Sequence, residues 1–195
     1  MQVINLKTPL DMTSIEALNI GDRVELSGTI FTARDIIHKY LCENDPVSMP
    51  FDITGGVLYH CGPIVRKING KYTVISSGPT TSERLEMYEP RMINRFGLRA
   101  IIGKGGMGED TLNALKTSGC VYLQTISGAG VYIADRIKSV LDVWKLDEFG
   151  EPEAMWLFDV CDFPAIVTMD CKGNSLHKDI YNQSTKQRDE IFSTI

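Results

Sequence analysis

The sequence predicts a mixed α/β fold in a single domain, and three observations lead to this prediction. Short apolar runs alternate with amphipathic runs through the middle of the chain, which is typical of strands and helices around a parallel sheet. An Asn-Gly pair stands between two strand-like runs and predicts a hairpin, so part of the sheet is antiparallel. The 195 residues contain no repeat and no low-complexity linker, and we expect one domain over residues 1–195.

The first predicted elements are a short helix, a strand and a second helix. Thr13 and Glu16 have the spacing of a capping box and indicate a helix start. Residues 23–33 form a strand-like run that contains Gly28, and residues 34–44 follow with helical periodicity. The apolar residues at helical spacing in that second helix are Ile36, Ile37, Tyr40 and Leu41.

The hairpin and the element after it come next. Asn69-Gly70 joins strand-like runs at 56–67 and 71–78, and the second run ends at Gly78-Pro79. Residues 81–97 have helical periodicity, and Pro90 should kink or break that helix. The start of a helix leaves N–H groups unpaired and carries a partial positive charge, so an anion would be stabilised there.

The second half of the chain continues the alternation. Strands are predicted at 98–103 and 120–127, with a helix between them that ends at Gly119. Residues 131–144 are predicted to form an amphipathic helix, because one helical face gathers Ile133, Ile137, Val140, Leu141 and Trp144. Two strands, at 153–160 and 165–170, and a polar helical tail at 176–192 complete the chain. We expect a sheet that is parallel in its middle and antiparallel at its flanks.

Composition limits the classes of function. The net charge of -5 argues against nucleic acid as a partner, because phosphate binding requires a basic surface. No apolar run approaches the roughly 20 residues of a membrane span, and residues 1–14 lack a signal-peptide pattern, so we expect a cytoplasmic protein. The five cysteines contain no C-x-x-C pair, which is typical of reduced thiols and offers no zinc or iron–sulfur signature. His60 stands in an apolar run and is interpreted as a packed strand residue.

The candidate site lies where three predicted strands end. The segments "GTIFTARD", "SSGPTTSER" and "IIGKGGMGED" each end a strand with a glycine, a hydroxyl or a base. Ligands gather beyond the carboxyl ends of strands in open α/β sheets. If these ends meet, one pocket for a carboxylate or phosphate contains Arg34, Thr80, Thr81, Arg84 and Lys104.

Each of these residues also has a simpler interpretation. Arg34 could pair with Asp35 on the surface, Thr80 could be a helix N-cap, and Arg84 could be a solvated helix residue. Lys104 stands between glycines and has little to pack against. The presence of all four residues at predicted strand ends favours an anion-binding site.

The stretch "GKGGMG" matches G-x-G-x-x-G through Gly103, Gly105 and Gly108, between a strand and a helix. Two features argue against a dinucleotide site. No acidic residue ends the next strand to hold a ribose, and Lys104 would crowd a pyrophosphate. The P-loop pattern is absent from the sequence.

The same motifs resemble the β-subunit of the class I fumarase and L-tartrate dehydratase family of iron–sulfur hydro-lyases. The similarity runs from "GDRVELSGTIFTARD" through "GPIVRK", "GPTTSERLE" and "GKGGMGEDT" to "DFPAIVTMDCKGNSL". It implies a swivelling β/β/α domain and the reversible loss or gain of water across a 2-hydroxy dicarboxylate. It also implies a cytoplasmic α2β2 enzyme of the tricarboxylic acid cycle, whose α-subunit holds a [4Fe-4S] cluster. This chain would hold no metal and would be inactive alone.

Residue roles also follow from the resemblance. Thr80 matches the proposed general base, and Arg34, Arg84 and Lys104 match the cations that bind the substrate. A threonine is a weak base, so its alkoxide needs a helix N-terminus or nearby cations to stabilise it. Thr81 is the alternative base. The sequence leaves fumarate and tartrate open as substrates, and we favour fumarate. A stand-alone module that binds a nucleotide or an anionic metabolite through "GKGGMG" is the competing hypothesis.

Overall fold

The computed structural model describes residues 3–45 and 47–194 of the chain. The strands are β1 (Val3–Lys7), β2 (Arg23–Thr32), β3 (Val57–Tyr59), β4 (Ile64–Ile68), β5 (Lys71–Ser76), β6 (Ala100–Gly103), β7 (Val121–Thr125), β8 (Ile137–Trp144) and β9 (Met155–Met169). The helices are α1 (Met12–Ala17), α2 (Asp35–Glu43), the 3₁₀ helix η1 (Ser82–Leu85), α3 (Glu89–Phe96), α4 (Glu109–Ser118), α5 (Gly130–Ala134), α6 (Leu146–Phe149) and α7 (Leu176–Ser193).

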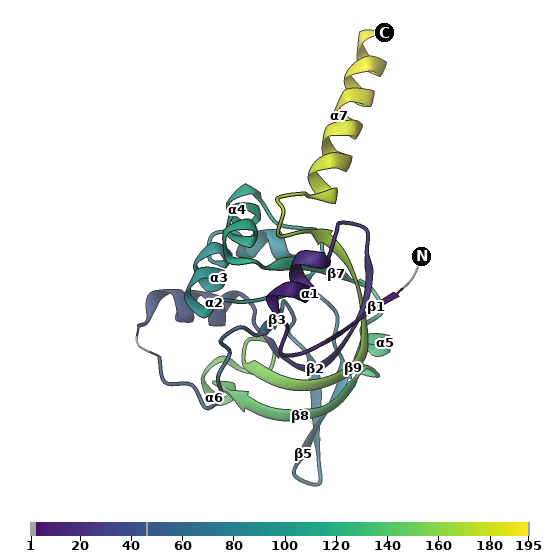
Figure 1. Cartoon of the computed structure of the whole chain (residues 1–195). Coiled ribbons are helices and arrows are strands. Elements are labelled where there is room, and N and C mark those ends of the chain that lie inside the picture. The colour runs from purple at the N-terminus through teal and green to yellow at the C-terminus, as the bar shows by residue number, and fades with distance from the viewer. Residues whose placement is uncertain (1–2, 46, 195) are drawn as a thin grey trace.

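The main sheet is mixed and curls into a partly closed barrel (Figure 1). Its order is β1-β2-β3-β6-β7-β9-β8, and the first five of these strands run parallel to one another. β9 runs antiparallel to β7 and β8. Because β9 also pairs with β2 over residues 157–166, the sheet closes on itself through this long strand. The predicted parallel middle is confirmed, whereas the N-terminal flank is parallel rather than antiparallel.

The parallel strands β3, β6 and β7 are buried on both faces, so their side chains contribute to two cores. Ala100 and Ile102 of β6 face the core inside the curved sheet, while Ile101 between them faces the helices. The outer core lies under α2, α3 and α4, which cover one side of the sheet (Figure 1). This packing fixes the ends of β2, β3 and β6 relative to the helices that follow them.

The predicted helix at 131–144 is wrong. The chain forms only the short α5 and then the strand β8, which pairs with β9. Two irregularities in register, after Ile137 and after Val140, each insert an extra residue into β8. They change the two-residue period of a strand into spacings of three, so Ile137, Val140 and Val143 all pack on the inner core. The apolar residues of this doubly bulged strand are therefore spaced like those of an amphipathic helix.

Three other predicted elements differ in detail. Asp11, and not Thr13, caps α1, because its side chain accepts the N–H of Ser14 at 2.7 Å. The predicted helix at 81–97 is divided into η1 and α3, and Pro90 lies in the first turn of α3. The two predicted strands at 153–160 and 165–170 are one strand, β9.

The predicted strand at 56–67 is divided into β3 of the main sheet and β4 of the hairpin, and the remaining predicted elements are confirmed. The β4–β5 hairpin turns at Asn69 and Gly70, which both have positive φ. α4 ends at Gly119 in the left-handed conformation. The polar tail forms α7, which projects from the body of the molecule and has no buried residue (Figure 1). Among the described residues, no helix combines the length and apolar character needed to cross a membrane.

Candidate active site

The loop that carries "GPTT" lies between the carboxyl ends of two neighbouring strands. The N–H of Thr80 donates to the carbonyl of His60, just after β3, at 2.7 Å. The N–H of Ser82 donates to the carbonyl of Lys104, just after β6, at 3.1 Å, and Thr81 forms a parallel bridge with Lys104. The predicted meeting of strand ends is therefore found here, with the loop paired in strand fashion to both neighbours.

Arg84 joins the threonine loop to the start of α2. Its Nη2 donates to Thr80 Oγ1 at 3.0 Å and to Asp35 Oδ2 at 3.1 Å. The Arg84 side chain is about half exposed and Asp35 is 40% exposed, so both can be reached by a solute. A guanidinium donor stabilises negative charge on the Thr80 oxygen.

Arg34 lies between two carboxylates. Its Nε is 3.4 Å from Glu153 Oε1 and 3.9 Å from Asp35 Oδ2. The suggested pairing with Asp35 is thus present, although the contact with Glu153 is shorter. A Cβ at position 62 would overlap the Arg34 side chain, so Gly62 leaves it the necessary room. Arg34 is 28% exposed and remains accessible at the edge of the sheet.

Glu153 is a member of this group that sequence reasoning missed. Its Oε2 accepts the N–H of Ile36 at 2.8 Å and so occupies the N-terminus of α2. It precedes β9, far from α2 in the sequence, and only the closure of β9 onto β2 brings it here. No local pattern could have found it.

Positive charge exceeds negative charge in this group. Lys104 is partly exposed and forms no ion pair with any residue that the structure describes. The group therefore has three cations, Arg34, Arg84 and Lys104, and the two carboxylates that pair with them among the described residues are Asp35 and Glu153. The excess of one positive charge favours an anionic ligand such as a carboxylate.

The element after "GPTT" is not the expected α-helix start. It is the four-residue η1, with Thr81 at its N-cap position and no side-chain cap. The interpretation of Thr80 as a helix N-cap is wrong, because its hydroxyl oxygen instead accepts the Arg84 guanidinium. A single 3₁₀ turn offers little dipole, so the Arg84 guanidinium is the stronger electrostatic influence on the Thr80 hydroxyl.

The glycine loop is shaped by packing. The Glu86 carboxylate occupies the N-terminus of α4, where it accepts the N–H of Gly108 at 2.7 Å and the N–H of Thr111 at 3.0 Å. A dinucleotide phosphate would need this same position. A Cβ at Gly103 would overlap the Ser82 hydroxyl. The geometry thus supports the argument against a dinucleotide site at this loop.

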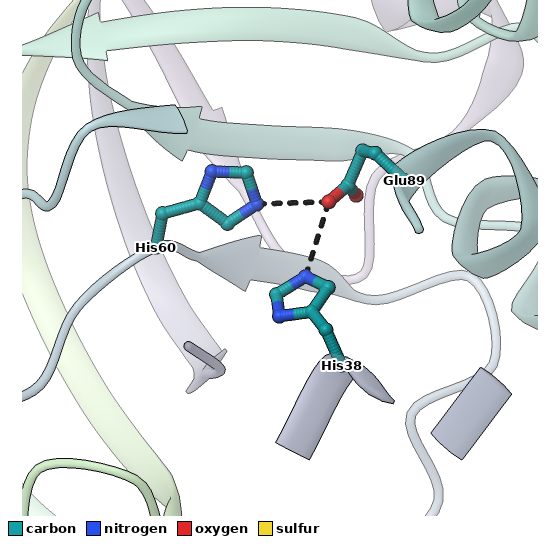
Figure 2. A group of neighbouring side chains, drawn as sticks. All are labelled: His38, His60 and Glu89. Atoms are coloured by element: carbon teal, nitrogen blue, oxygen red, sulfur yellow. Dashed lines mark hydrogen bonds and ion pairs between the residues drawn. The ribbon is translucent and has the colours of Figure 1, made fainter. Parts of the chain in front are cut away.

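The structure brings together two histidines that appear scattered in the sequence. His38 Nε2 and His60 Nε2 contact the same oxygen, Glu89 Oε2, at 3.1 and 3.0 Å, and all three side chains are fully buried (Figure 2). The interpretation of His60 as a packed residue is confirmed. The three side chains have the donor atoms of a metal site. In the structure both Nε2 atoms lie within hydrogen-bond distance of Glu89 Oε2 itself, so the three side chains are joined directly to one another.

The cysteines of the described chain do not form a cluster site. His38, His60 and Glu89 are the one group there with metal-ligand chemistry, and it contains no thiol. Burial raises the pKa of Cys61 to about 11 and raises the pKa of Cys42 and Cys120. Among the described residues, no cysteine belongs to a group of three or more side chains with converging ligand atoms.

Comparison with known proteins identifies the family. The sequence profile described as Fumarase C-terminus matches residues 1–180. A provisionally named class I fumarate hydratase of Geobacillus stearothermophilus is 48% identical over 98% of this chain. The chain spans only 38% of that relative.

Two further relatives match over nearly their whole length. A provisionally named L(+)-tartrate dehydratase subunit beta of Methanocaldococcus jannaschii is 37% identical, over 94% of this chain and 95% of the relative. The L(+)-tartrate dehydratase subunit beta of Escherichia coli strain K12 is 35% identical, over 97% of this chain and 94% of the relative. From the profile and these relatives, the chain belongs to the fumarase C-terminus family.

Proposed function

We propose that this chain is the β-subunit of a two-subunit hydro-lyase that reversibly hydrates fumarate to malate. The observation that carries the proposal is the contact of Thr80 Oγ1 with the Arg84 guanidinium, on a loop held between the strand ends that carry His60 and Lys104. The names of the relatives, fumarate hydratase and tartrate dehydratase, are those of hydro-lyases. We assign the whole chain, residues 1–195, to one β-subunit-type domain.

In this proposal Thr80 is the general base and Arg34, Arg84 and Lys104 bind the substrate. Thr80, as the alkoxide stabilised by Arg84, takes the proton from the carbon beside the hydroxyl-bearing carbon of malate. The electron pair of that C–H bond forms the double bond of fumarate, and the hydroxyl leaves with its own bonding pair. The cations hold the two carboxylates and stabilise the charge that develops on the carboxylate beside the deprotonated carbon.

The proposal includes a partner subunit. Two relatives are named as subunit beta, and the Geobacillus relative is much longer than this chain. We assign the [4Fe-4S] cluster of this family to the α-subunit, and the absence of a cysteine from any group of converging ligand atoms among the described residues supports this assignment. The cluster would supply a Lewis acid for the leaving hydroxyl. An α2β2 assembly in the cytoplasm, acting in the tricarboxylic acid cycle, completes the proposal.

L-tartrate dehydration to oxaloacetate is the second candidate. The lengths of the relatives favour tartrate, because the two tartrate dehydratase β-subunits match this chain almost end to end. The higher identity to the fumarate hydratase favours fumarate. A stand-alone nucleotide module has less support, since Glu86 occupies the N-terminus of α4.

An anaerobic assay tests the proposal. The chain is purified alone and together with a co-expressed α-subunit, and each sample is offered malate and L-tartrate separately. We expect no turnover by the chain alone and turnover by the pair, with the faster substrate deciding between the two candidates. A pair with a loaded cluster that turns over neither substrate would refute the function.

A further inference from the structure

The buried group of His38, Glu89 and His60 lies behind the candidate site and connects its parts (Figure 2). All three side chains are fully buried. Glu89 stands in the first turn of α3, while His38 belongs to α2 and His60 follows β3. A fully buried carboxylate is costly unless it is paired, so this group holds three separate elements together.

The hydrogen-bond partners fix where the protons are. His38 Nδ1 lies 2.6 Å from the carbonyl oxygen of Arg34, which can only accept. His38 Nε2 faces the Glu89 carboxylate, which also only accepts when ionised. Burial opposes the ionised form of Glu89, but the neighbouring His60 and His38 rings outweigh it and lower the pKa of Glu89. His38 Nδ1 is therefore the donor toward the Arg34 carbonyl.

His60 has the complementary arrangement. Burial lowers the pKa of His60, so its ring is neutral. Its Nε2–H donates to Glu89 Oε2, and its Nδ1 then accepts the hydroxyl proton of Ser82 at 2.9 Å. The Tyr122 hydroxyl in turn donates to Ser82 Oγ at 2.7 Å. A chain of hydrogen bonds thus runs from Tyr122 to the carbonyl of Arg34.

The two histidines of this chain of hydrogen bonds each contact the backbone of a candidate site residue. His38 holds the carbonyl of Arg34, the residue before α2. The His60 ring holds Ser82, two residues after Thr80, and the His60 carbonyl accepts the N–H of Thr80. Glu89 Oε2 is the single atom that joins the two halves.

We propose that Glu89 is a positioning residue that, through His38 and His60, fixes the Arg34 backbone relative to the Thr80 loop. Glu89 does not contact the substrate in this proposal. The kinetic part of the inference rests on the proposed function. A displacement of about 1 Å between groups that must meet the same substrate lowers a rate by about 100-fold.

Three variants of the co-purified complex test this. Glu89→Ala removes the joining atom, and we expect kcat/KM to fall about 100-fold. Ile93→Ala is the matched control, because Ile93 is fully buried one turn further along α3 and has an apolar side chain that takes no part in the chain of hydrogen bonds. It creates a cavity of similar consequence for stability, and its kcat/KM should stay within about threefold of the wild type.

Glu89→Gln is the rescue. A glutamine amide can donate both of its N–H groups to the two Nε2 atoms, with each ring then protonated on Nδ1 toward Arg34 O and Ser82 Oγ. We expect it to recover most of the activity that Glu89→Ala loses. Equal losses in Glu89→Ala and Ile93→Ala, or wild-type activity in Glu89→Ala, would overturn the proposal. The proposal would also be overturned if the wild-type complex held one metal ion per chain that is lost in Glu89→Gln.

Hydrogen exchange separates this inference from the proposed function. In the same complexes, Glu89→Ala should speed amide exchange in residues 33–38 and 78–84, and Ile93→Ala should leave these segments as in the wild type. This readout needs no turnover. If the wild-type complex is inactive but the exchange result is obtained, the function fails and the positioning role stands. Unchanged exchange in both segments would overturn the positioning role.

Discussion

The guanidinium of Arg84 donates to the hydroxyl oxygen of Thr80 at 3.0 Å and to the carboxylate of Asp35 at 3.1 Å through the same nitrogen. Arg84 therefore serves two acceptors, one on the threonine loop and one at the start of α2. An incoming substrate carboxylate would compete with Asp35 for this nitrogen. The contact with Thr80 would remain and stabilise the alkoxide.

Replacement of Arg84 should weaken substrate binding and turnover together. Arg84→Ala removes a charged donor from both the substrate and Thr80, and such hydrogen bonds contribute about 1.5–3 kcal/mol. We expect kcat/KM of the assembled enzyme to fall between about tenfold and 150-fold. Arg91→Ala is the control, since Arg91 is an exposed arginine of α3 without an ion pair among the described residues. Equal kinetics for the two variants would exclude Arg84 from the site.

The neutral state of His60 predicts a dependence of stability on pH. Burial lowers the pKa of His60 in the folded state below the ordinary 6.5. The unfolded chain therefore binds more protons below about pH 6.5, and the stability that neutral His60 contributes at higher pH is lost as the pH falls. His60→Gln lacks this group. As the pH falls from 6.5 to 5, the free energy of unfolding of the wild type should therefore decrease relative to that of the variant. The change should be up to about 1.4 kcal/mol per pH unit.

Urea unfolding at a series of pH values measures this difference. A difference that stays constant with pH, or that shifts in favour of the wild type toward acid, would mean that His60 is protonated in the fold.

Glu86 should stabilise the glycine loop as a side-chain cap of α4. Its carboxylate accepts the N–H groups of Gly108 and Thr111 and the Thr111 hydroxyl. Glu86→Ala should therefore lower the free energy of unfolding by about 2 kcal/mol. Glu83→Ala removes an exposed neighbour whose carboxylate makes no hydrogen bond among the described residues, and it should change stability by less than about 0.5 kcal/mol. Matching unfolding curves for the two variants would contradict the cap.

Local sequence patterns predicted most of the fold correctly. The Asn69-Gly70 turn, the Gly119 helix end and the parallel strands depend on residues close together in the chain. The strand β8 could not be predicted, because two bulges set its apolar residues three apart and only its pairing with β9 reveals them. The cap of α1 was missed because Asp11 and Thr13 are both suitable cap residues.

The candidate site was predicted only in part, because local motifs identify some of its residues and distant contacts bring in the others. Motifs at strand ends identified Arg34, Thr80, Arg84 and Lys104, and parallel strands bring such ends together. Glu153 and the buried Glu89 could not be found, because their partners lie on elements distant in the sequence. The roles of the four predicted residues remain proposals that mutation must test.

The measurement that most directly tests the proposed chemistry is the anaerobic kcat of the α–β complex with three single variants of the threonine loop. Thr80→Ala removes the proposed base, while Thr80→Ser keeps a hydroxyl there. Thr81→Ala alters the exposed alternative, whose side chain makes no cap bond to η1. We expect kcat to fall at least about 100-fold in Thr80→Ala, to recover largely in Thr80→Ser and to change less than about threefold in Thr81→Ala. Ordinary turnover by Thr80→Ala, or a large loss in Thr81→Ala alone, would contradict the assignment of Thr80 as the base.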